Sequence, residues 1–132
     1  LGRKLLLLVE NVMQTGERIP KVTADISISK ALLEISSKGL GMTGIVDEAG
    51  ILIGVYTDGD LRRTLDQGLD IHNTLLKDVM STKCKVTHPH VLAVEALALM
   101  EKSKINGLMV VDEQRRPVGA LNMHDLLRAG VM

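Results

Sequence analysis

The chain has 132 residues, enough for one domain or for two small units that share a core, because a unit of about 60 residues buries too little surface to be stable alone. Hydrophobic residues make up 45% of it, but with no Trp or Phe and one Tyr, few aromatic side chains can stack on bases. Sixteen basic and sixteen acidic residues cancel, which disfavours nucleic acids and membranes as partners. A small ligand or a protein partner is expected instead.

The first residues of the chain have the features of a linker and not of a membrane anchor or a secretory signal. The longest early apolar run, Leu5 to Val9, is far too short to span a bilayer, and nothing resembles a secretory signal. The single Cys84 cannot form an internal disulfide, so we expect a protein of the reducing cytoplasm. The chain starts without Met, and we interpret residues 1–11 as a linker from an upstream domain.

A constant spacing joins the two halves of the chain, which predicts a duplicated unit. The spacing is 65 residues over most of each half and slips toward its start, to 64 at Val22-Thr23 and Val86-Thr87 and to 67 at Val12-Met13 and Val79-Met80, as small loop insertions would produce. We expect repeat 1 at residues 12–66, a connection at 67–78 and repeat 2 at 79–132. The pairs in register are Gly54 with Gly119, Asp60 with Asp125, and Val46-Asp47-Glu48 with Val111-Asp112-Glu113.

Repeat 1 predicts the order βαββα. A short strand at 21–23 precedes a helix whose apolar residues recur at i, i+3, i+4 and i+7, with Ser27 as the expected N-cap. Apolar runs at 44–46 and 51–56 flank turn residues and predict a hairpin, after which a second helix begins at Asp58. The apolar positions of the first helix are Ile28, Ala31, Leu32 and Ile35.

Repeat 2 predicts the same order, with a strand at 85–87, a hairpin from 108–111 and 118–121, and a last helix from Met123. Leu92 stands where repeat 1 has its N-cap, so the cap of this helix must come from elsewhere. The expected fold class is α/β (α+β), with tandem βαββα units packed as a pseudo-twofold pair. The apolar positions of its first helix are Ala93, Ala96, Leu97 and Met100.

Each hairpin ends in the pattern Gly-x-x-(Thr/Asn)-x-x-Asp, which puts Thr57 three residues before Asp60 and Asn122 three before Asp125. One interpretation is an N-cap with an acidic residue in the first helical turn. The other is a binding site, in which the carboxylate accepts hydrogen bonds from a cis-diol such as the ribose hydroxyls. Both can hold at once, and the spacing alone does not decide between them.

The βαββα duplication, the Val-Met openings, the Val-Val-Asp turn and the Gly-x-x-(Thr/Asn)-x-x-Asp endings resemble a CBS domain pair over nearly the whole chain. This resemblance implies a non-catalytic module that binds adenosine-type nucleotides between its strands and the second helix. Residues 56–63 and 121–131 further resemble the C-terminal half of bacterial D-arabinose 5-phosphate isomerases. That family implies an upstream sugar isomerase domain that serves lipopolysaccharide sugar (3-deoxy-manno-octulosonate) synthesis, while the present chain is expected to be inert as an isomerase.

Carried over residue by residue, the resemblance implies ligand-binding residues in both repeats. Repeat 2 departs from the usual Thr or Ser at Asn122 and has bulky Met109 where repeat 1 has Gly44, so we expect two unequal sites. The implied ribose and phosphate contacts are Thr57, Asp60, Asn122 and Asp125, and those near the base are Thr23 and Thr87. Further phosphate candidates, equally interpretable as surface cations, are Arg62, Arg63, His124 and Arg128.

The leading hypothesis is a regulatory sensor whose ligand, bound between the copies, is AMP, ADP, ATP or a cytidine monophosphate-activated sugar, with no catalytic cofactor. The alternative is a ligand-free structural module, since duplicated units of this kind commonly form homodimers. An independent enzyme is disfavoured, because no nucleophile with its base or glycine-rich phosphate loop is evident. Cys84, His88 and His90 have weak spacing for a closed metal site, and we expect none.

Overall fold

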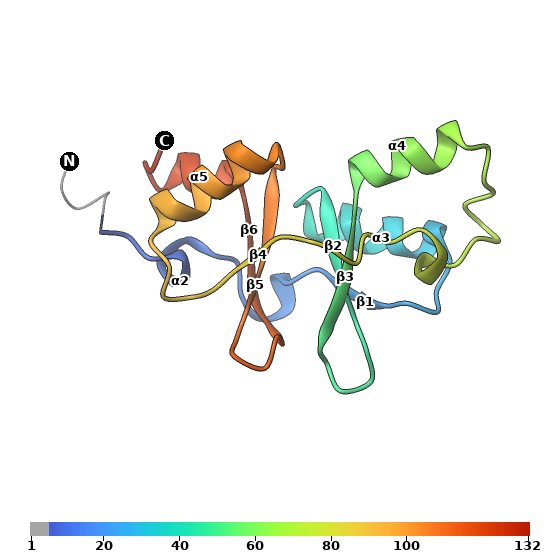
Figure 1. Cartoon of the computed structure of the whole chain (residues 1–132), viewed down its shortest axis with the longest axis horizontal. Coiled ribbons are helices and arrows are strands. Elements are labelled where there is room, and N and C mark those ends of the chain that lie inside the picture. Colours follow the sequence, from blue (N-terminus) through green and yellow to red (C-terminus); the bar gives the residue numbers. More distant parts are fainter. Residues whose placement is uncertain (1–5) are drawn as a thin grey trace. The chain divides into compact units, whose positions relative to one another are not determined.

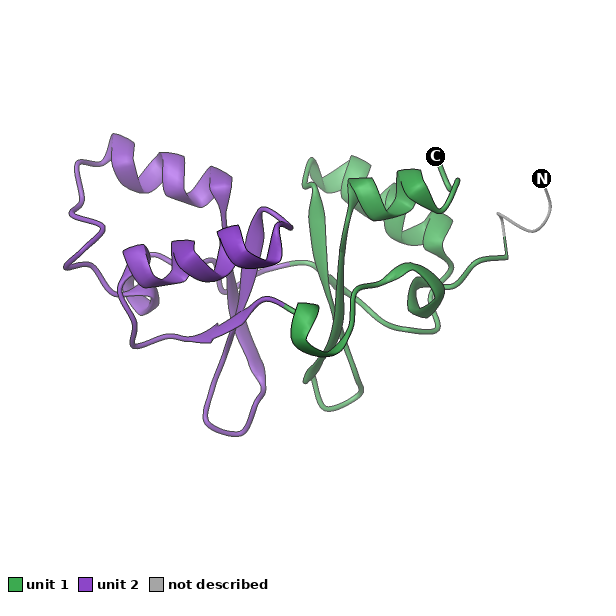
Figure 2. Cartoon of the chain, turned by 180° about the vertical axis from the view of Figure 1, so that it is seen from behind, with its two compact units in different colours: residues 1–19, 85–132 green, residues 20–84 purple. Residues whose placement is uncertain are grey.

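The computed structural model describes residues 6–132, which divide into two units (Figures 1 and 2). Unit 2 comprises residues 20–84, whereas unit 1 combines the N-terminal residues up to 19 with residues 85–132. Residues 1–5 of the expected linker lie outside the described residues. Within the described part of the chain, no helix is both long enough and apolar enough to cross a membrane.

Unit 2 has the predicted βαββα order, and the prediction is confirmed. Its sheet has the order β1-β2-β3, with β2 parallel to β1 and antiparallel to β3. A register shift between Ile45 and Val46 marks a bulge in the hairpin. The elements are β1 (Lys21–Thr23), α3 (Ile28–Lys38), β2 (Met42–Val46), β3 (Leu52–Thr57), α4 (Asp58–Asp66) and the 3₁₀ turn η2 (Leu76–Asp78).

Unit 1 repeats this order with the sheet β4-β5-β6, including a register shift between Val110 and Val111 that matches the one in unit 2. The repeated bulge supports the inference that one unit was duplicated. The elements are β4 (Val86–Thr87), α5 (Ala93–Ser103), β5 (Gly107–Val111), β6 (Pro117–Asn122) and α6 (Met123–Arg128), preceded at the N-terminus by α2 (Val9–Val12) and the 3₁₀ turn η1 (Gly16–Arg18).

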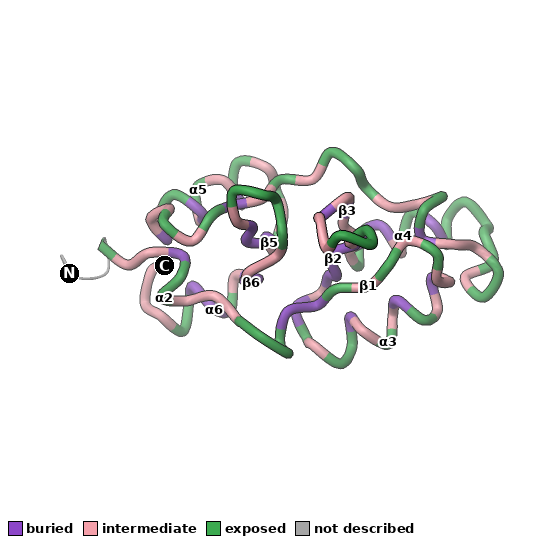
Figure 3. The backbone as a smooth tube through the Cα atoms, turned by 90° about the horizontal axis from the view of Figure 1, so that it is seen from below, coloured by how far each residue is buried: buried purple, intermediate pink, exposed green. Residues whose placement is uncertain are grey.

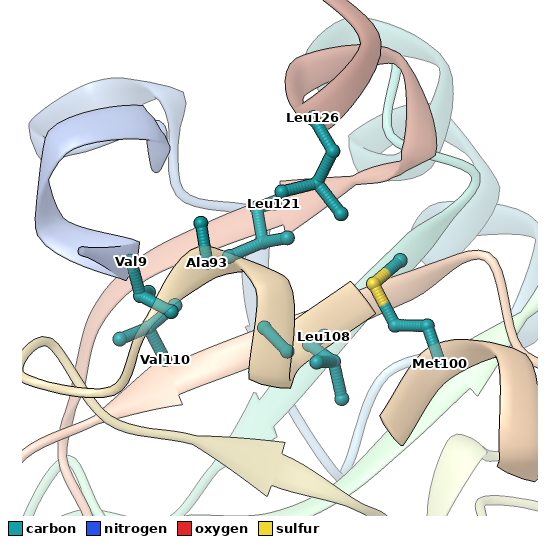
Figure 4. Close-up of a cluster of buried hydrophobic side chains, with 8 residues drawn as sticks. Val9, Ala93, Met100, Leu108, Val110, Leu121 and Leu126 are labelled. Carbon is teal, nitrogen blue, oxygen red and sulfur yellow. The ribbon is translucent and has the colours of Figure 1, made fainter. Parts of the chain in front are cut away.

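Each unit has its own apolar core, which lies between one face of the sheet and its two helices. In unit 2 the buried positions Ile28, Ala31 and Ile35 recur along α3 at helical spacing (Figure 3). They pack with Ile45 and Tyr56 of the sheet. In unit 1 the core residues shown in Figure 4 come from α2, α5, β5, β6 and α6, namely Val9, Ala93, Met100, Leu108, Val110, Leu121 and Leu126.

The opening segment of each repeat packs on the unit formed by the other repeat. Gln14 bridges to Ala120 of β6, and the residue 67 positions later, Ser81, bridges to Val55 of β3. Figure 2 shows the first of these segments in the colour of residues 85–132. The repeats defined in the sequence therefore differ from the units in space, because residues 12–19 of repeat 1 belong to unit 1 and residues 79–84 of repeat 2 belong to unit 2.

The same segment supplies the missing cap of α5. Ser27 Oγ accepts a hydrogen bond from the N–H of Lys30 at 3.3 Å, which confirms it as the N-cap of α3. At α5 the first N–H, that of Ala93, donates instead to the carbonyl of Leu7 at 2.7 Å. Part of the expected linker is therefore a structural element of unit 1, since a backbone carbonyl replaces the side-chain cap.

Candidate ligand-binding carboxylates

Asp60 lies in the first turn of α4 and is only 7% exposed. Its Oδ2 accepts hydrogen bonds from the N–H of Thr57 at 2.9 Å and from the Thr57 hydroxyl at 3.1 Å. The N–H of Asp60 donates in return to Thr57 Oγ1 at 3.1 Å, which completes a capping box. Oδ1 pairs with the guanidinium of Arg63, whose side chain is 68% exposed. The capping interpretation is confirmed here, and the second oxygen faces a solvated arginine.

Asp125 has a similar local geometry, in which Gln14 donates to the carboxylate in place of a cap-residue hydroxyl. Its Oδ2 accepts from the N–H of Asn122 at 2.9 Å, and its own N–H donates to Asn122 Oδ1 at 3.1 Å. Its Oδ1 pairs with Arg128 and also accepts from the Gln14 side-chain amide, Nε2, at 2.7 Å. The carboxylate is 4% exposed by residue, whereas the Arg128 side chain is 66% exposed. Capping is confirmed in this unit as well.

The two carboxylates differ in how their acceptor positions are used. A carboxylate has about four such positions, and contacts among the described residues occupy three at Asp60 and three at Asp125. At Asp60 two of them fall on Oδ2, because the Thr57 hydroxyl donates there. At Asp125 two fall on Oδ1. The Thr-to-Asn difference removes a donor from Oδ2, and Gln14 adds one at Oδ1, so the oxygen that keeps an open position differs between the units.

A buried hydrogen-bond chain supports the start of α4. The hydroxyl of Tyr56, a fully buried residue, lies 2.8 Å from Thr64 Oγ1, and Thr64 in turn donates to the carbonyl of Asp60 at 2.9 Å. Burial raises the pKa of the Tyr56 phenol, and the hydrogen bond with Thr64 opposes part of that effect. The phenol therefore stays neutral and helps to hold the helix turn that carries Asp60.

The two predicted base contacts lie far from the carboxylates within their units. Thr23 pairs with Val46 at one end of β2, whereas Thr57 pairs with Met42 at the other end. Met42 and Val46 are four residue steps apart along β2, which corresponds to about 13 Å. In unit 1 Thr87 pairs with Val110 and Asn122 pairs with Gly107, three residue steps apart along β5 or about 10 Å. No unit by itself brings its predicted base and ribose contacts together.

Local contacts already engage the side chain of Thr23. Its hydroxyl donates to Asp25 Oδ1 at 2.6 Å, and this hydrogen bond is the main reason that the pKa of the exposed Asp25 lies below its ordinary value. Thr87, in contrast, is 3% exposed. The predicted phosphate contacts Arg62 and His124 are exposed residues of α4 and α6. Of the four phosphate candidates, Arg63 and Arg128 are those paired with a site carboxylate.

A surface hollow of about 710 Å³ lies at the other end of the unit 1 sheet from Asp125. One wall carries His88, whose ring Nδ1 donates to the carbonyl of Val111 at 2.9 Å. Within residues 6–132, no cluster of three or more His, Cys, Asp or Glu side chains could hold a metal ion. The residues that line the hollow are His88, Pro89, His90, Val111, Asp112, Glu113, Gln114 and Arg115.

Gln14 contacts a candidate carboxylate, Asp125, but belongs to no motif of the sequence. It lies 111 residues before Asp125, near the start of repeat 1, and a lone Gln has no motif of its own. The available signal was the 67-residue match between Val12-Met13 and Val79-Met80, which marks an equivalent segment in each half. That match does not tell which sheet each segment joins.

The chain belongs to the CBS domain family, since the CBS domain model matches residues 9–67 and 76–131. Over its whole length it is 55% identical to arabinose 5-phosphate isomerase KdsD of Pseudomonas aeruginosa and 48% identical to that of Escherichia coli K12. The matched part is the C-terminal region of these relatives, and the chain spans 40% of the length of each. Both resemblances inferred from the sequence are confirmed.

Solved structures of CBS domain pairs share this fold, and two of them were determined with bound nucleotides or related adenosine compounds. The CBS domain pair of protein MJ0100, in complex with 5′-methylthioadenosine and S-adenosyl-L-methionine, is 26% identical, with a TM-score of 0.84 over 93% of this chain and 94% of that one. The structure of CBSX2 in complex with AMP is 22% identical, with a TM-score of 0.80 over 95% and 96% of the two chains. The tandem βαββα fold class is therefore confirmed, and the second likeness bears on the fold alone.

Proposed function

We propose that the chain is a regulatory nucleotide-sensing module in which Asp60 and Asp125 accept hydrogen bonds from ribose hydroxyls. The observation that carries the proposal is a buried carboxylate, repeated in both units, whose Oδ2 is held by a helix cap while Oδ1 pairs with an exposed arginine. The MJ0100 domain pair supports it, because both ligands named with that structure contain an adenosine ribose. Identity of 26% makes similar ligand chemistry reasonable here.

In the proposed binding step, the ribose diol replaces the arginine that pairs with the carboxylate. Two hydroxyls need two acceptor positions, and each carboxylate keeps about one. Release of Arg63 or Arg128 supplies the second position. These arginine side chains are 68% and 66% exposed, whereas their carboxylate partners are 8% and 2% exposed, so a released guanidinium is hydrated by solvent while the diol hydroxyls take over its hydrogen bonds to the buried carboxylate. The released guanidinium remains beside the site, where it can pair with a ligand phosphate.

The two sites are expected to differ in affinity. Once Arg128 has left, Asp125 has one open position on each oxygen, which suits a cis-diol that donates one hydroxyl to each. At Asp60 the Thr57 hydroxyl occupies Oδ2, so both ligand hydroxyls would meet at Oδ1. We therefore expect the first equivalent of ligand to bind at Asp125.

The proposed ligand is an adenine nucleotide or a cytidine monophosphate-activated sugar, and the proposed output is control of an upstream arabinose 5-phosphate isomerase domain. The relatives support the proposed control of an isomerase domain, because they are named arabinose 5-phosphate isomerases. The chain matches only 40% of their length, which leaves room in them for a separate catalytic domain. A ligand that favours one arrangement of such a domain would change its activity through a coupling of typically ~1–3 kcal/mol. We place the protein in the cytoplasm, where both nucleotides and the sugar phosphate occur.

Exposed leucines on the helices favour the rival proposal, a structural module that assembles copies of the chain. Leu33 of α3 is 72% exposed, Leu65 of α4 54% and Leu127 of α6 57%. Such side chains gain from burial in a homodimer. The two functions are compatible, and ligand binding distinguishes a sensor from a module that only assembles.

Ligand titration tests the carboxylates. We expect ribonucleotides to raise the midpoint of thermal unfolding, because a ligand at 100 times its Kd stabilises a fold by about 2.7 kcal/mol. Asp125→Asn should lower the affinity of the tighter site about 10–100-fold, as should a 2′-deoxy analogue offered to the wild type. Calorimetry with AMP, ATP, cytidine monophosphate and its activated sugar measures both effects.

Asparagine is preferred to alanine in these variants, because it keeps one oxygen for the cap at Thr57 or Asn122. Asp60→Asn is the companion variant for the weaker site. Equal binding of ribose and deoxyribose ligands would disprove the diol contact. If none of the four nucleotides moves the unfolding midpoint, the assembly function is left as the better account.

Replacement of Arg63 tests whether the ligand diol displaces this arginine from Asp60. Arg63→Ala should tighten binding of uncharged adenosine at Asp60, by up to about fivefold, because the diol no longer displaces an ion pair. The same variant should weaken binding of AMP, which loses a phosphate partner. The matched control is Arg62→Ala, an adjacent exposed arginine that should leave the adenosine affinity unchanged. An unchanged ratio of adenosine to AMP affinity in Arg63→Ala would contradict the exchange.

A further inference from the structure

We propose that Gln14 is a positioning residue of the Asp125 site and that it links nucleotide binding in unit 1 to the docking of residues 6–19. The inference deepens the proposed function and rests on it, since it concerns the same carboxylate. Gln14 lies outside the Gly-x-x-(Thr/Asn)-x-x-Asp pattern, and the segment that contains it would dock more firmly when nucleotide is bound.

Gln14 contacts two parts of the site at once. Its side-chain Nε2 donates to Asp125 Oδ1 at 2.7 Å. Its N–H donates to the carbonyl of Ala120 at 2.7 Å, and its carbonyl accepts from the N–H of Ala120 at 3.1 Å. Ala120 belongs to β6, the strand that leads directly into α6 and Asp125. The backbone contacts therefore fix where the side-chain amide can reach.

The rest of the segment is anchored in the core of unit 1. Val9 is fully buried among the core side chains (Figure 4), and its N–H donates to the carbonyl of Val91 at 2.8 Å. The carbonyl of Leu7 accepts from Ala93 at the start of α5. Because these contacts come from one short segment, we expect residues 7–14 to dock and undock together.

The two partners of Asp125 Oδ1 respond differently to a ligand. Arg128 is largely exposed and can move into solvent when a diol approaches. Gln14 is half-buried and has a fixed backbone, so it stays and remains the side-chain donor to that oxygen. A carboxylate held in this way loses less rotational freedom on binding the diol. Docked residues 6–19 and bound nucleotide therefore stabilise each other, and by linkage the effect is reciprocal.

Unit 2 offers a matched control. Ser81, 67 residues after Gln14, makes the same two backbone hydrogen bonds, here with Val55 at 2.9 and 3.0 Å. The donors to Asp60 among the described side chains are those of Thr57 and Arg63, so Ser81 has no corresponding role there. Ser81→Ala thus removes a side chain at the equivalent backbone position without touching a site carboxylate.

Titrations of the full chain with AMP and, separately, with cytidine monophosphate test the proposal. We expect Gln14→Ala to weaken binding at the tighter site about tenfold, as loss of a hydrogen bond to a charged group would. Gln14→Glu, which keeps the size but places an acceptor against Asp125, should weaken it at least as much. Ser81→Ala should bind like the wild type. In hydrogen exchange, ligand should slow the amides of residues 6–19 in the wild type and in Ser81→Ala but not in Gln14→Ala.

Several results would overturn the proposal. Wild-type affinity in Gln14→Glu would mean that Gln14 contributes only packing, and unchanged protection of residues 6–19 in Gln14→Ala would remove the link. If neither nucleotide binds the wild type, the proposed function fails. Urea unfolding of Gln14→Ala, Asp125→Asn and the double variant then still tests whether the Gln14 and Asp125 side chains interact. Strictly additive effects in that cycle would show that the two side chains do not interact, whereas non-additive effects support the contact alone.

Discussion

Leu126→Ala is expected to destabilise unit 1 by about 2–5 kcal/mol, the usual range for a leucine truncated in a core. Leu126 is fully buried and packs with Leu121, Met100 and other residues of the cluster in Figure 4. The residue directly follows Asp125, so the same contact that fills the core holds the carboxylate against the sheet. Urea or thermal unfolding of the full chain measures the effect.

The neighbouring residue provides the control for this prediction. Leu127 lies one position along α6 but is 57% exposed, and Leu127→Ala should change the free energy of unfolding by no more than about 0.5 kcal/mol. Similar losses for the two variants would mean that α6 does not dock through Leu126. We also expect Leu126→Ala to weaken nucleotide binding, because the helix that carries Asp125 loses its anchor.

Gly54→Ala is expected to cost about 1–3 kcal/mol, the range for an atom forced into a packed interior. A Cβ at Gly54 would lie 2.9 Å from the backbone carbonyl of Ser81 and 3.1 Å from Met80 Sδ. The carbonyl is fixed by its hydrogen bond with Val55, so the strand and the crossing segment must separate. Denaturant unfolding should show the loss, and hydrogen exchange should show it first at residues 75–81.

Gly59→Ala is the matched control in the same unit. Its Cβ would meet nothing closer than 3.6 Å, and the residue lies in the first turn of α4, where alanine is favoured over glycine by up to about 1 kcal/mol. We expect a small gain in stability. A loss at Gly59 as large as that at Gly54 would show that general intolerance of glycine replacement, and not the close approach of Ser81, sets the cost.

Gly119 allows a further comparison, because its nearest neighbour can move. A Cβ there would overlap Met13 Sδ, but this atom belongs to a flexible side chain that can adopt another rotamer. The nearest backbone atom is the Gln14 carbonyl at 3.1 Å. The repeated glycine that first revealed the duplication thus has one physical reason in both units, namely the approach of a crossing segment to the hairpin.

Local features of the fold could be predicted because their causes lie within a few residues. Hydrophobic periodicity identified the helices, and the three-residue spacing of Thr57 and Asp60 identified the capping box that both units contain. Ser27 was recognised as an N-cap for the same reason. The cap of α5 was not, since it is a backbone carbonyl of Leu7, and every residue has such a group.

The amino-acid sequence by itself determined the duplication, the order βαββα and the two capped aspartates. Only the tertiary structure decided that residues 6–19 pack in one unit with repeat 2, through the bridge from Gln14 to Ala120, and that Gln14 reaches Asp125. The physical reason is that the two repeats offer nearly equivalent hairpin strands, with Val55 and Ala120 as the bridging positions, so local preferences are similar for either pairing. The choice between them depends on the combined packing of many side chains and on the length of chain available between the segments.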